Sequence, residues 1–234
     1  MIDFSLVMPV QNQAEIISKV VKSIVKVLKE NKIKYQLVMV ENGSSDKTLV
    51  ILKHLAKKNN KIKVTVSDAG YGRAVIHGLN LADGKYVCYM PSDGQCDEKV
   101  LPQVFIGAKK TDLAKVFRTT RESILRTSVS LGFNFLANLL FNLKVKDINA
   151  SPTCFLKSKL KILKLKSPDS FLDTELLIKA KYFKWQIVRI PMRNFKREGG
   201  KSTVKPPIVL EFLKNMLEWK FIKFKQWKNE IKKL

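Results

Sequence analysis

Apolar runs with strand character alternate along the first half of the chain with segments whose apolar positions recur about every 3.6 residues. The strand-like runs are FSLVMPV (4–10), YQLVMVEN (35–42), IKVTVSD (62–68), KYVCYMPSD (85–93) and LAKVFRT (113–119). Such alternation is typical of repeated strand–helix units, so it predicts an α/β protein whose mostly parallel sheet is sandwiched by helices. No internal repeat or low-complexity linker appears, and a single domain over residues 1–205 is expected.

The second half of the chain predicts a long helix over 122–143, a short strand near CFLK (154–157), a helix over 172–183 and a strand over 186–197. The segment 206–234 predicts a basic amphipathic helix from about residue 208 to the end. Its apolar positions near helical spacing are Val209, Phe212, Leu213, Met216, Phe224 and Trp227. Lysines and aromatic residues together favour an anionic membrane surface, and a helix packed on the protein's own sheet explains the pattern equally well.

The longest uncharged stretch, residues 127–143, carries several serines and asparagines and falls short of the ~20 apolar residues that a spanning helix needs. No transmembrane segment is predicted, although this helix could lie at an interface. The beginning, MIDFSLVMPV, lacks a basic leader followed by an apolar core, and Cys88, Cys96 and Cys154 form no CxxC pair. A cytoplasmic protein with reduced cysteines and no structural zinc is therefore expected.

The net charge of +24 would attract nucleic acid, an anionic membrane or phosphorylated ligands. Much of the excess is lysine scattered over helical segments, and solvated helix faces explain it without any ligand. Because no RRM, KH or zinc-finger pattern occurs, a nucleic-acid partner is not expected.

Polar pairs follow several of the predicted strands directly. They are Gln11–Asn12, Glu41–Asn42, Ser67–Asp68 and Ser92–Asp93. In a parallel sheet the carboxyl ends of the strands meet at one edge, where ligands collect, so these pairs predict a ligand crevice. The turn at residues 70–73 has a short GxG and lacks a full dinucleotide fingerprint, which disfavours a dinucleotide oxidoreductase.

The segments VMPVQNQAEII, VENGSSDKT and GYGRAVIHGLNLADGKYVCYMPSDGQCDE, in this order, resemble the family 2 glycosyltransferases of GT-A (Rossmann-like) fold. The later segments FRTTRES, RTSVS, DINAS, LDTELLIKA, IPMRN and REGGKST are similar in order and spacing to the branch of dolichol-phosphate mannosyltransferases and polyprenyl-phosphate glycosyltransferases. The resemblance spans roughly residues 5–205. The chain departs from the family pattern at Gln11, Gln13, Glu41, Asn42 and Pro91.

The resemblance implies an inverting glycosyltransferase that moves a sugar from a nucleotide-sugar donor to a polyprenyl phosphate, either dolichyl or undecaprenyl. It would act as a peripheral protein on the cytoplasmic face of a membrane. A family member that uses a hydroxyl acceptor is the nearest alternative. The departures also allow a non-catalytic homologue that binds a nucleotide sugar, and the sugar, nucleotide and oligomeric state stay open.

Breaking the bond to a diphosphate leaving group needs a divalent metal or other cations to stabilise the developing charge. The resemblance implies Mg²⁺ or Mn²⁺ held by Asp93 with the amide oxygen of Gln95. Pro91 stands where the family has a second carboxylate, so metal binding is expected to be weaker or dispensable. An ordinary β-turn explains PSDG without any ligand.

The donor-binding residues that the resemblance implies lie in the strand-end pairs and in two glycine-containing segments. They are Pro9, Asn12, Glu41, Asn42, Asp68, Gly72, Ser92, Arg197, Lys201 and Ser202. The carboxylate and amide side chains are candidates for hydrogen bonds to a base, and the basic KREGGKST loop suits a diphosphate. Helix capping by Ser44 or Ser45 is the competing explanation for the second strand end.

A lipid monophosphate is already anionic at neutral pH, so it needs cations to hold it and no general base. Arg118, Arg126 and Ser130 match by position the acceptor-phosphate residues of the resembling branch, and with Asp93 they form the predicted catalytic set. Arginine can grip a phosphate with two parallel hydrogen bonds. In so basic a chain these arginines could equally be surface cations. Asp173 and Glu175 match further acidic positions and are expected to be supports or a base.

Overall fold

The computed structural model describes residues 2–120, 124–195 and 213–233. Within these ranges one 7-stranded sheet has the order β3-β2-β1-β4-β6-β5-β7. The strands are β1 (Phe4–Val10), β2 (Tyr35–Glu41), β3 (Ile62–Val66), β4 (Tyr86–Tyr89), β5 (Leu113–Arg118), β6 (Thr153–Leu156) and β7 (Ile187–Met192). Only β6 runs against its neighbours, and the other pairings are parallel. The predicted mostly parallel α/β sheet is confirmed.

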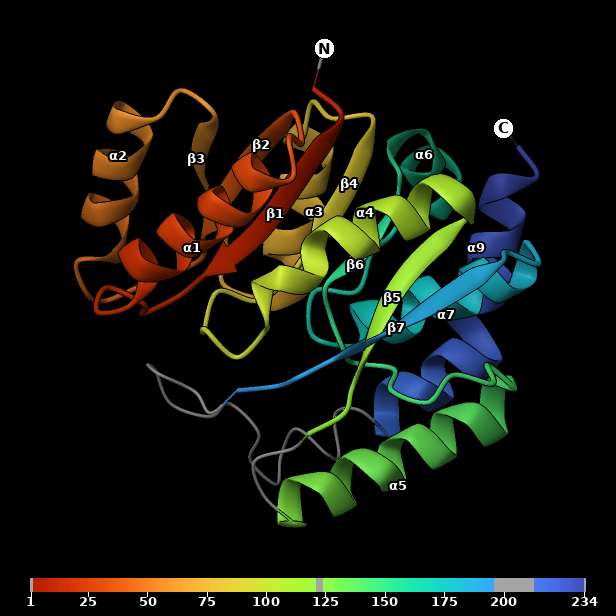
Figure 1. The fold of residues 1–234 in the computed structure, drawn as a ribbon. Coiled ribbons are helices and arrows are strands. Elements are labelled where there is room, and N and C mark those ends of the chain that lie inside the picture. The colour runs from red at the N-terminus through yellow and green to blue at the C-terminus, as the bar shows by residue number, and fades with distance from the viewer. Residues whose placement is uncertain (1, 121–123, 196–212, 234) are drawn as a thin grey trace.

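Helices cover both faces of the sheet (Figure 1). One face carries α1 (Ile17–Glu30), α2 (Thr48–Lys58) and α4 (Leu101–Lys110). The opposite face carries α3 (Tyr71–Leu81), α5 (Ile124–Phe141), α6 (Leu160–Leu163), α7 (Leu172–Tyr182) and the C-terminal helical segment. Short 3₁₀ turns, η1 (Glu98–Val100) and η2 (Lys157–Lys159), precede α4 and α6.

The alternating direction of side chains along a strand explains this two-sided burial. On β1, Phe4, Leu6 and Met8 pack into the core beneath α1 and α4, whereas Val7 packs beneath α3. Every residue of β1 and β2 is buried. Continuous apolar runs are therefore what a parallel sheet covered on both faces requires, and they made these strands recognisable in the sequence.

The C-terminal segment is helical over residues 213–231, with a π-helical stretch, η3 (Trp219–Lys223), followed by α9 (Phe224–Ile231). Met216, Trp219 and Trp227 are buried against the rest of the protein, and the Trp227 Nε1–H donates to the Leu163 carbonyl at 3.0 Å. The predicted C-terminal helix is thus present, and these side chains pack on the protein's own body. Val209 and Phe212 lie outside the described residues.

No helix in the described part of the chain combines the length and apolarity that crossing a bilayer requires.

Candidate active site

The topology gathers the polar strand ends at one edge of the sheet. The carboxyl ends of the six mutually parallel strands lie there together with the amino end of β6, because β6 runs in the opposite direction. The polar pairs that follow β1, β2, β3 and β4 therefore lie at this edge. Arg118, at the end of β5, and residues 147–151, before β6, lie there too.

The loops after β1 and β2 are joined to each other by hydrogen bonds. Asn12 has a positive φ of 50°, and its Oδ1 accepts the Ser45 N–H at 2.8 Å. Its own N–H donates to Ser44 Oγ at 3.0 Å, and the Glu41 carboxylate accepts the Ser44 N–H. Asp46 accepts the Ala14 N–H at 3.1 Å. The side chains of Asn12 and Glu41 thus shape the loops themselves.

Two buried amide oxygens beside these loops have no hydrogen-bond partner within the described part of the chain: Asn42 Oδ1 and Gln13 Oε1. A buried acceptor without a donor costs ~1–3 kcal/mol, which a ligand N–H would relieve. Asn42 therefore has the chemistry expected of a base partner. Gln13 appeared in the sequence only as a departure from the family pattern, and its signal was a polar residue next to a strand end.

Asp93 lies at the end of β4 in a tight turn. Its Oδ1 accepts the Gln95 N–H at 3.2 Å, and Gly94 has a φ of 72°, a conformation that glycine adopts without strain. The preceding Ser92 donates to the Pro9 carbonyl at 2.8 Å and so joins the ends of β4 and β1. The predicted β-turn is therefore present, and the metal site at Asp93 stays a prediction.

Gln95 is held by the segment that follows β7. Its Nε2 donates to the Phe195 carbonyl at 3.4 Å, and the Phe195 N–H donates to the Gln95 carbonyl at 2.8 Å. Its amide oxygen is the only atom of that amide that can coordinate a cation.

The oxygen ligands at this turn suit a metal ion that a bound substrate also coordinates. Within the described residues no three His, Cys, Asp or Glu side chains converge as a metal cluster. Mg²⁺ commonly takes one or two carboxylates and completes its shell with substrate phosphates and water. Asp93 with the amide oxygen of Gln95 suits that arrangement and does not form a closed protein cage.

Asp68 and Gly72 flank the turn into α3 in different environments. Asp68 is exposed after β3. A Cβ on Gly72 would lie 2.1 Å from the Ser167 carbonyl oxygen, and the Arg73 N–H donates to the Pro168 carbonyl at 3.1 Å. Glycine at position 72 thus allows the first turn of α3 to pack directly on the loop before α7.

Arg118 forms a bidentate ion pair with Asp147. Its Nε and Nη2 donate to the two carboxylate oxygens at 2.9 and 2.8 Å, and its backbone N–H adds a third bond at 3.1 Å. Burial opposes the charge on Arg118, but the hydrogen bonds and charge of Asp147 raise its pKa overall. The guanidinium is therefore a fixed cation at the site edge, with 25% of its side chain exposed.

A second ionic group lies beneath Arg118. Lys115, Asp173 and Tyr89 are buried, with Lys115 Nζ 3.5 Å from Asp173 Oδ1 and the Tyr89 hydroxyl donating to the same oxygen at 2.7 Å. Burial raises the pKa of Asp173, against the opposing effect of Lys115, and burial lowers the pKa of Lys115. Lys115 was not predicted as a site residue, and its only sequence signal is a lysine inside an apolar strand.

Glu175 supports the loop before α7. Its carboxylate accepts the backbone N–H groups of Lys166 and Ser167 and pairs with Lys179, and both members of this pair are fully buried. Its contacts are those of a structural support, one of the roles expected for it.

The remaining predicted residues fall on α5 and beyond β7. Ser130 accepts two hydrogen bonds from Asn134 Nδ2, at 2.7 Å on its carbonyl and 3.3 Å on its Oγ. The side chain of Arg126 lies outside the described residues, as do Arg197, Lys201 and Ser202.

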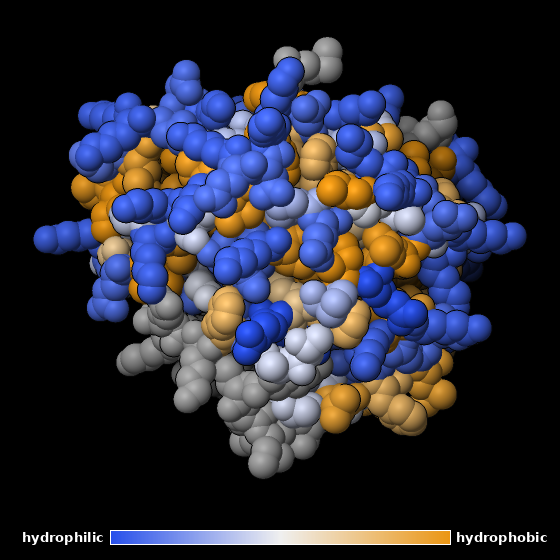
Figure 2. All heavy atoms as spheres, viewed as in Figure 1, coloured by the Kyte–Doolittle hydropathy of each residue, from blue (hydrophilic) through white to orange (hydrophobic). Residues whose placement is uncertain are grey.

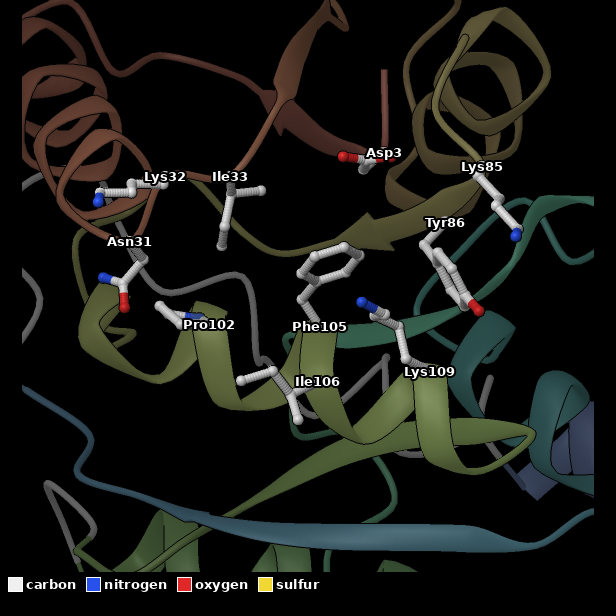
Figure 3. Close-up of a pocket in the computed structure, with 10 residues that line it drawn as sticks. All are labelled: Asp3, Asn31, Lys32, Ile33, Lys85, Tyr86, Pro102, Phe105, Ile106 and Lys109. Carbon is white, nitrogen blue, oxygen red and sulfur yellow. The ribbon is translucent and has the colours of Figure 1, made fainter. Parts of the chain in front are cut away.

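Two cavities lie at the opposite edge of the sheet. The first, about 390 Å³, is bordered by the amino ends of β1, β2 and β4 and by α4 (Figure 3). The rings of Tyr86 and Phe105 meet edge-on with their centroids 5.6 Å apart, and Lys109 Nζ lies 5.4 Å from the Phe105 centroid. The second adjoins the end of β6. Neither contains a predicted site residue, so the candidate site rests on the strand-end cluster.

Solved structures place this architecture among GT-A proteins. Glucosyl-3-phosphoglycerate synthase from Mycobacterium tuberculosis, in complex with Mn²⁺, uridine-diphosphate-glucose and phosphoglyceric acid, superposes with a TM-score of 0.71 at 16% identity. The match covers 93% of this chain and 79% of that one. At this identity the likeness concerns the fold alone, and the protein is of the GT-A class.

The profile of "Glycosyl transferase family 2" matches residues 5–157, and the chain belongs to this family. It is similar to a dodecaprenyl-phosphate galacturonate synthase from Rhizobium johnstonii, 25% identical over 70% of this chain and 51% of that protein. An undecaprenyl-phosphate 4-deoxy-4-formamido-L-arabinose transferase from Edwardsiella ictaluri is 24% identical over 85% of this chain and 62% of that one. The chain therefore spans less than two thirds of the length of these relatives.

Proposed function

We propose that the protein transfers a sugar from a nucleotide-sugar donor to a polyprenyl phosphate at an anionic membrane surface. One observation carries the proposal: Asp93 and Arg118 lie at the same edge of the sheet, and Asp147 holds Arg118 in place. Membership of glycosyl transferase family 2 and the polyprenyl-phosphate substrates named for two relatives support the same reaction.

The donor would bind along the ends of β1, β2 and β4. Asn42 Oδ1 and Gln13 Oε1 would accept hydrogen bonds from the base, which relieves their buried, unpartnered state. Asp93 and Gln95 would hold Mg²⁺ or Mn²⁺ against the diphosphate, where the ion supplies charge stabilisation as the leaving group departs. The presence of Mn²⁺ and uridine diphosphate in a structural neighbour supports this assignment.

The acceptor would bind beside β5. Arg118 supplies a fixed positive charge, and a lipid phosphate needs charge rather than proton abstraction. Asp173, the carboxylate expected as a base, is buried and bound by Lys115 and Tyr89. That arrangement supports a phosphate acceptor over the hydroxyl acceptor that a general base would serve.

A direct test incubates the full chain with labelled nucleotide sugars, Mn²⁺ and either polyprenyl phosphate or the same lipid after phosphatase treatment. The proposal expects labelled glycolipid from the phosphorylated lipid alone. Equal product from the dephosphorylated lipid would favour the hydroxyl-acceptor alternative. Nucleotide-sugar binding with no product from either lipid would favour the non-catalytic homologue.

A further inference from the structure

Two asparagines of helix α5 point toward the loop before β6. Asn134 Oδ1 accepts the Ile148 N–H at 2.8 Å. One turn later, Asn138 accepts the Val145 N–H at 3.1 Å and donates to the Val145 carbonyl at 2.8 Å. The asparagines thereby bind the backbone of the loop before β6. The helix must then present other positions to the outside.

Apolar side chains occupy those outer positions. Leu131, Phe135 and Leu139, each four residues apart, are 57%, 67% and 68% exposed. Residues at this spacing share one face of a helix. Hydrophobic atoms gather at the lower right of Figure 2, over the region where α5 lies in Figure 1.

The C-terminal helical segment repeats this arrangement. Its residues Leu213, Leu217 and Phe221 are 38%, 53% and 70% exposed, again at intervals of four, while Met216 and Trp219 are buried. Lys220 Nζ donates to the Leu140 carbonyl at 2.7 Å, so this segment lies against the end of α5. We call the exposed side chains the two-helix apolar face: Leu131, Phe135, Leu139, Leu213, Leu217 and Phe221.

Lysines gather at the α5 end of this face. Lys181 Nζ donates to the Phe141 and Asn142 carbonyls at 2.9 and 2.6 Å. Desolvation lowers the pKa of Lys181, and the positive charges of Lys144 and Lys220 lower it further. Lys220 Nζ donates to the neighbouring Leu140 carbonyl, so the amines of Lys181 and Lys220 share the carboxyl end of α5, and Lys144 follows two residues after Asn142. A concentrated positive charge beside apolar side chains is complementary to anionic lipid headgroups above a hydrocarbon layer.

We propose that the two-helix apolar face docks the protein on an anionic phospholipid bilayer. The apolar side chains enter the headgroup boundary, and Lys144, Lys181 and Lys220 contact the lipid phosphates. The link to the lipid acceptor rests on the proposed function. Ser130, a candidate acceptor residue, directly precedes Leu131, so docking through Leu131 brings the acceptor region to the lipid. A second copy of the chain is disfavoured as the occupant, since a two-fold contact would oppose identical lysine clusters.

The test measures sedimentation of the full chain with vesicles of phosphatidylcholine alone or mixed equally with phosphatidylglycerol. The Phe135→Ser/Leu139→Ser/Phe221→Ser variant is expected to lose binding to the mixed vesicles, by roughly tenfold for each side chain that enters the boundary. A matched control is Val50→Ser/Ile106→Ser, which changes two exposed apolar residues of α2 and α4.

Charge is tested separately with Lys144→Gln/Lys220→Gln against the control Lys26→Gln/Lys53→Gln on α1 and α2. Each lysine at the lipid surface is expected to contribute about fivefold to binding of the mixed vesicles, and added salt should erase the difference. Circular dichroism and nucleotide-sugar binding verify that every variant keeps its fold and donor site.

Parent-like vesicle binding by the serine variant would overturn the proposal. So would a parent dimer that the serine variant converts to a monomer, because the face would then join two copies. Loss of vesicle binding in the serine variant, with the control unaffected, supports the docking surface. If the parent binds vesicles through this face but forms no glycolipid from any donor, the proposed function fails and the docking surface stands.

Discussion

The loop pair and the ionic cluster of the candidate site are held together by different interactions. The loop pair, residues 11–14 and 41–48, is partly exposed and uses hydrogen bonds of 2.8–3.1 Å between the backbone of one loop and side chains of the other. The ionic cluster, Lys115, Arg118, Asp147 and Asp173, uses charged pairs in the protein interior. Losing one neutral exposed bond costs ~0.5–1.5 kcal/mol, whereas removing one member of a buried ion pair costs ~3–5 kcal/mol.

The comparison explains where this chain tolerates departures from its family pattern. Glu41 still accepts a backbone N–H from Ser44, which an aspartate or another acceptor could also do locally. In the ionic cluster the charges are paired inside the protein, and the Asp147 side chain that binds Arg118 is 2% exposed. We therefore expect substitutions in the loop pair to change which ligand binds. Substitutions in the ionic cluster should lower the stability of the whole fold.

The largest expected effect is on stability, from Lys115→Met. The substitution leaves Asp173 buried without its cation and should lower the free energy of unfolding by ~3–5 kcal/mol. Urea denaturation measures it, with Lys26→Met as the exposed control. Adding Asp173→Asn should recover part of the loss by removing the unpaired charge. If Lys115→Met were as stable as the control, the contrast between the two regions would be wrong.

Asp93→Ala is expected to reduce sugar transfer by roughly 10²–10³-fold and to remove Mn²⁺-dependent nucleotide-sugar binding, because this carboxylate is the proposed charged metal ligand. Isothermal titration with and without Mn²⁺ measures the binding. Asp97→Asn, which alters a nearby carboxylate that accepts the Lys99 N–H, is the control. Donor affinity equal to that of the parent would contradict the metal assignment.

Restoring the missing family carboxylate with Pro91→Asp should increase metal affinity in the same titration. Unchanged metal affinity would mean that position 91 does not face the ion.

Arg118→Ala is combined with Asp147→Asn, so that the variant loses the guanidinium without leaving a buried carboxylate that lacks its Arg118 partner. Losing a charged hydrogen bond to the acceptor should weaken transition-state binding by ~1.5–3 kcal/mol, while nucleotide-sugar affinity stays near that of the parent. Initial rates over a range of lipid phosphate concentrations measure this change. Arg189→Ala, on β7, serves as the matched control. An equal loss of donor affinity would assign Arg118 to the donor side.

The smallest effect concerns the pH dependence of the loop pair. Slight burial opposes the charge of Asp46, but hydrogen bonds from Thr48 and Ala14 lower its pKa below the ordinary value of 3.8. Its stabilising contribution is therefore complete above that value and is lost as the pH falls through the lowered pKa. Thermal unfolding of Asp46→Asn should show a slightly weaker loss of stability toward acid pH than the parent. Identical acid profiles would contradict a role for this carboxylate.

The strands and the strand-end residues were predictable because both depend on local order along the chain. The apolar runs that became β1 and β2 are buried on both faces, and a polar residue after such a strand must lie at its carboxyl end. The turn at Asp93 was predictable for the same reason. The inward direction of Asn134 and Asn138 was not, because a polar side chain in a helix is ordinarily expected to face water.

The α/β alternation, the family pattern and the set of polar residues at the strand ends could be read from the chain alone, since periodicity and short segments define them. Tertiary structure alone decided which charges became partners. Lys115 lies on β5 and Asp173 on α7. Arg118, at the end of β5, pairs with Asp147 in the segment before β6. It likewise decided that α5 would bury its asparagines and expose Phe135 and Leu139. The physical reason is that buried backbone groups and charges must find hydrogen-bond partners, and those partners come from distant segments brought together by the sheet.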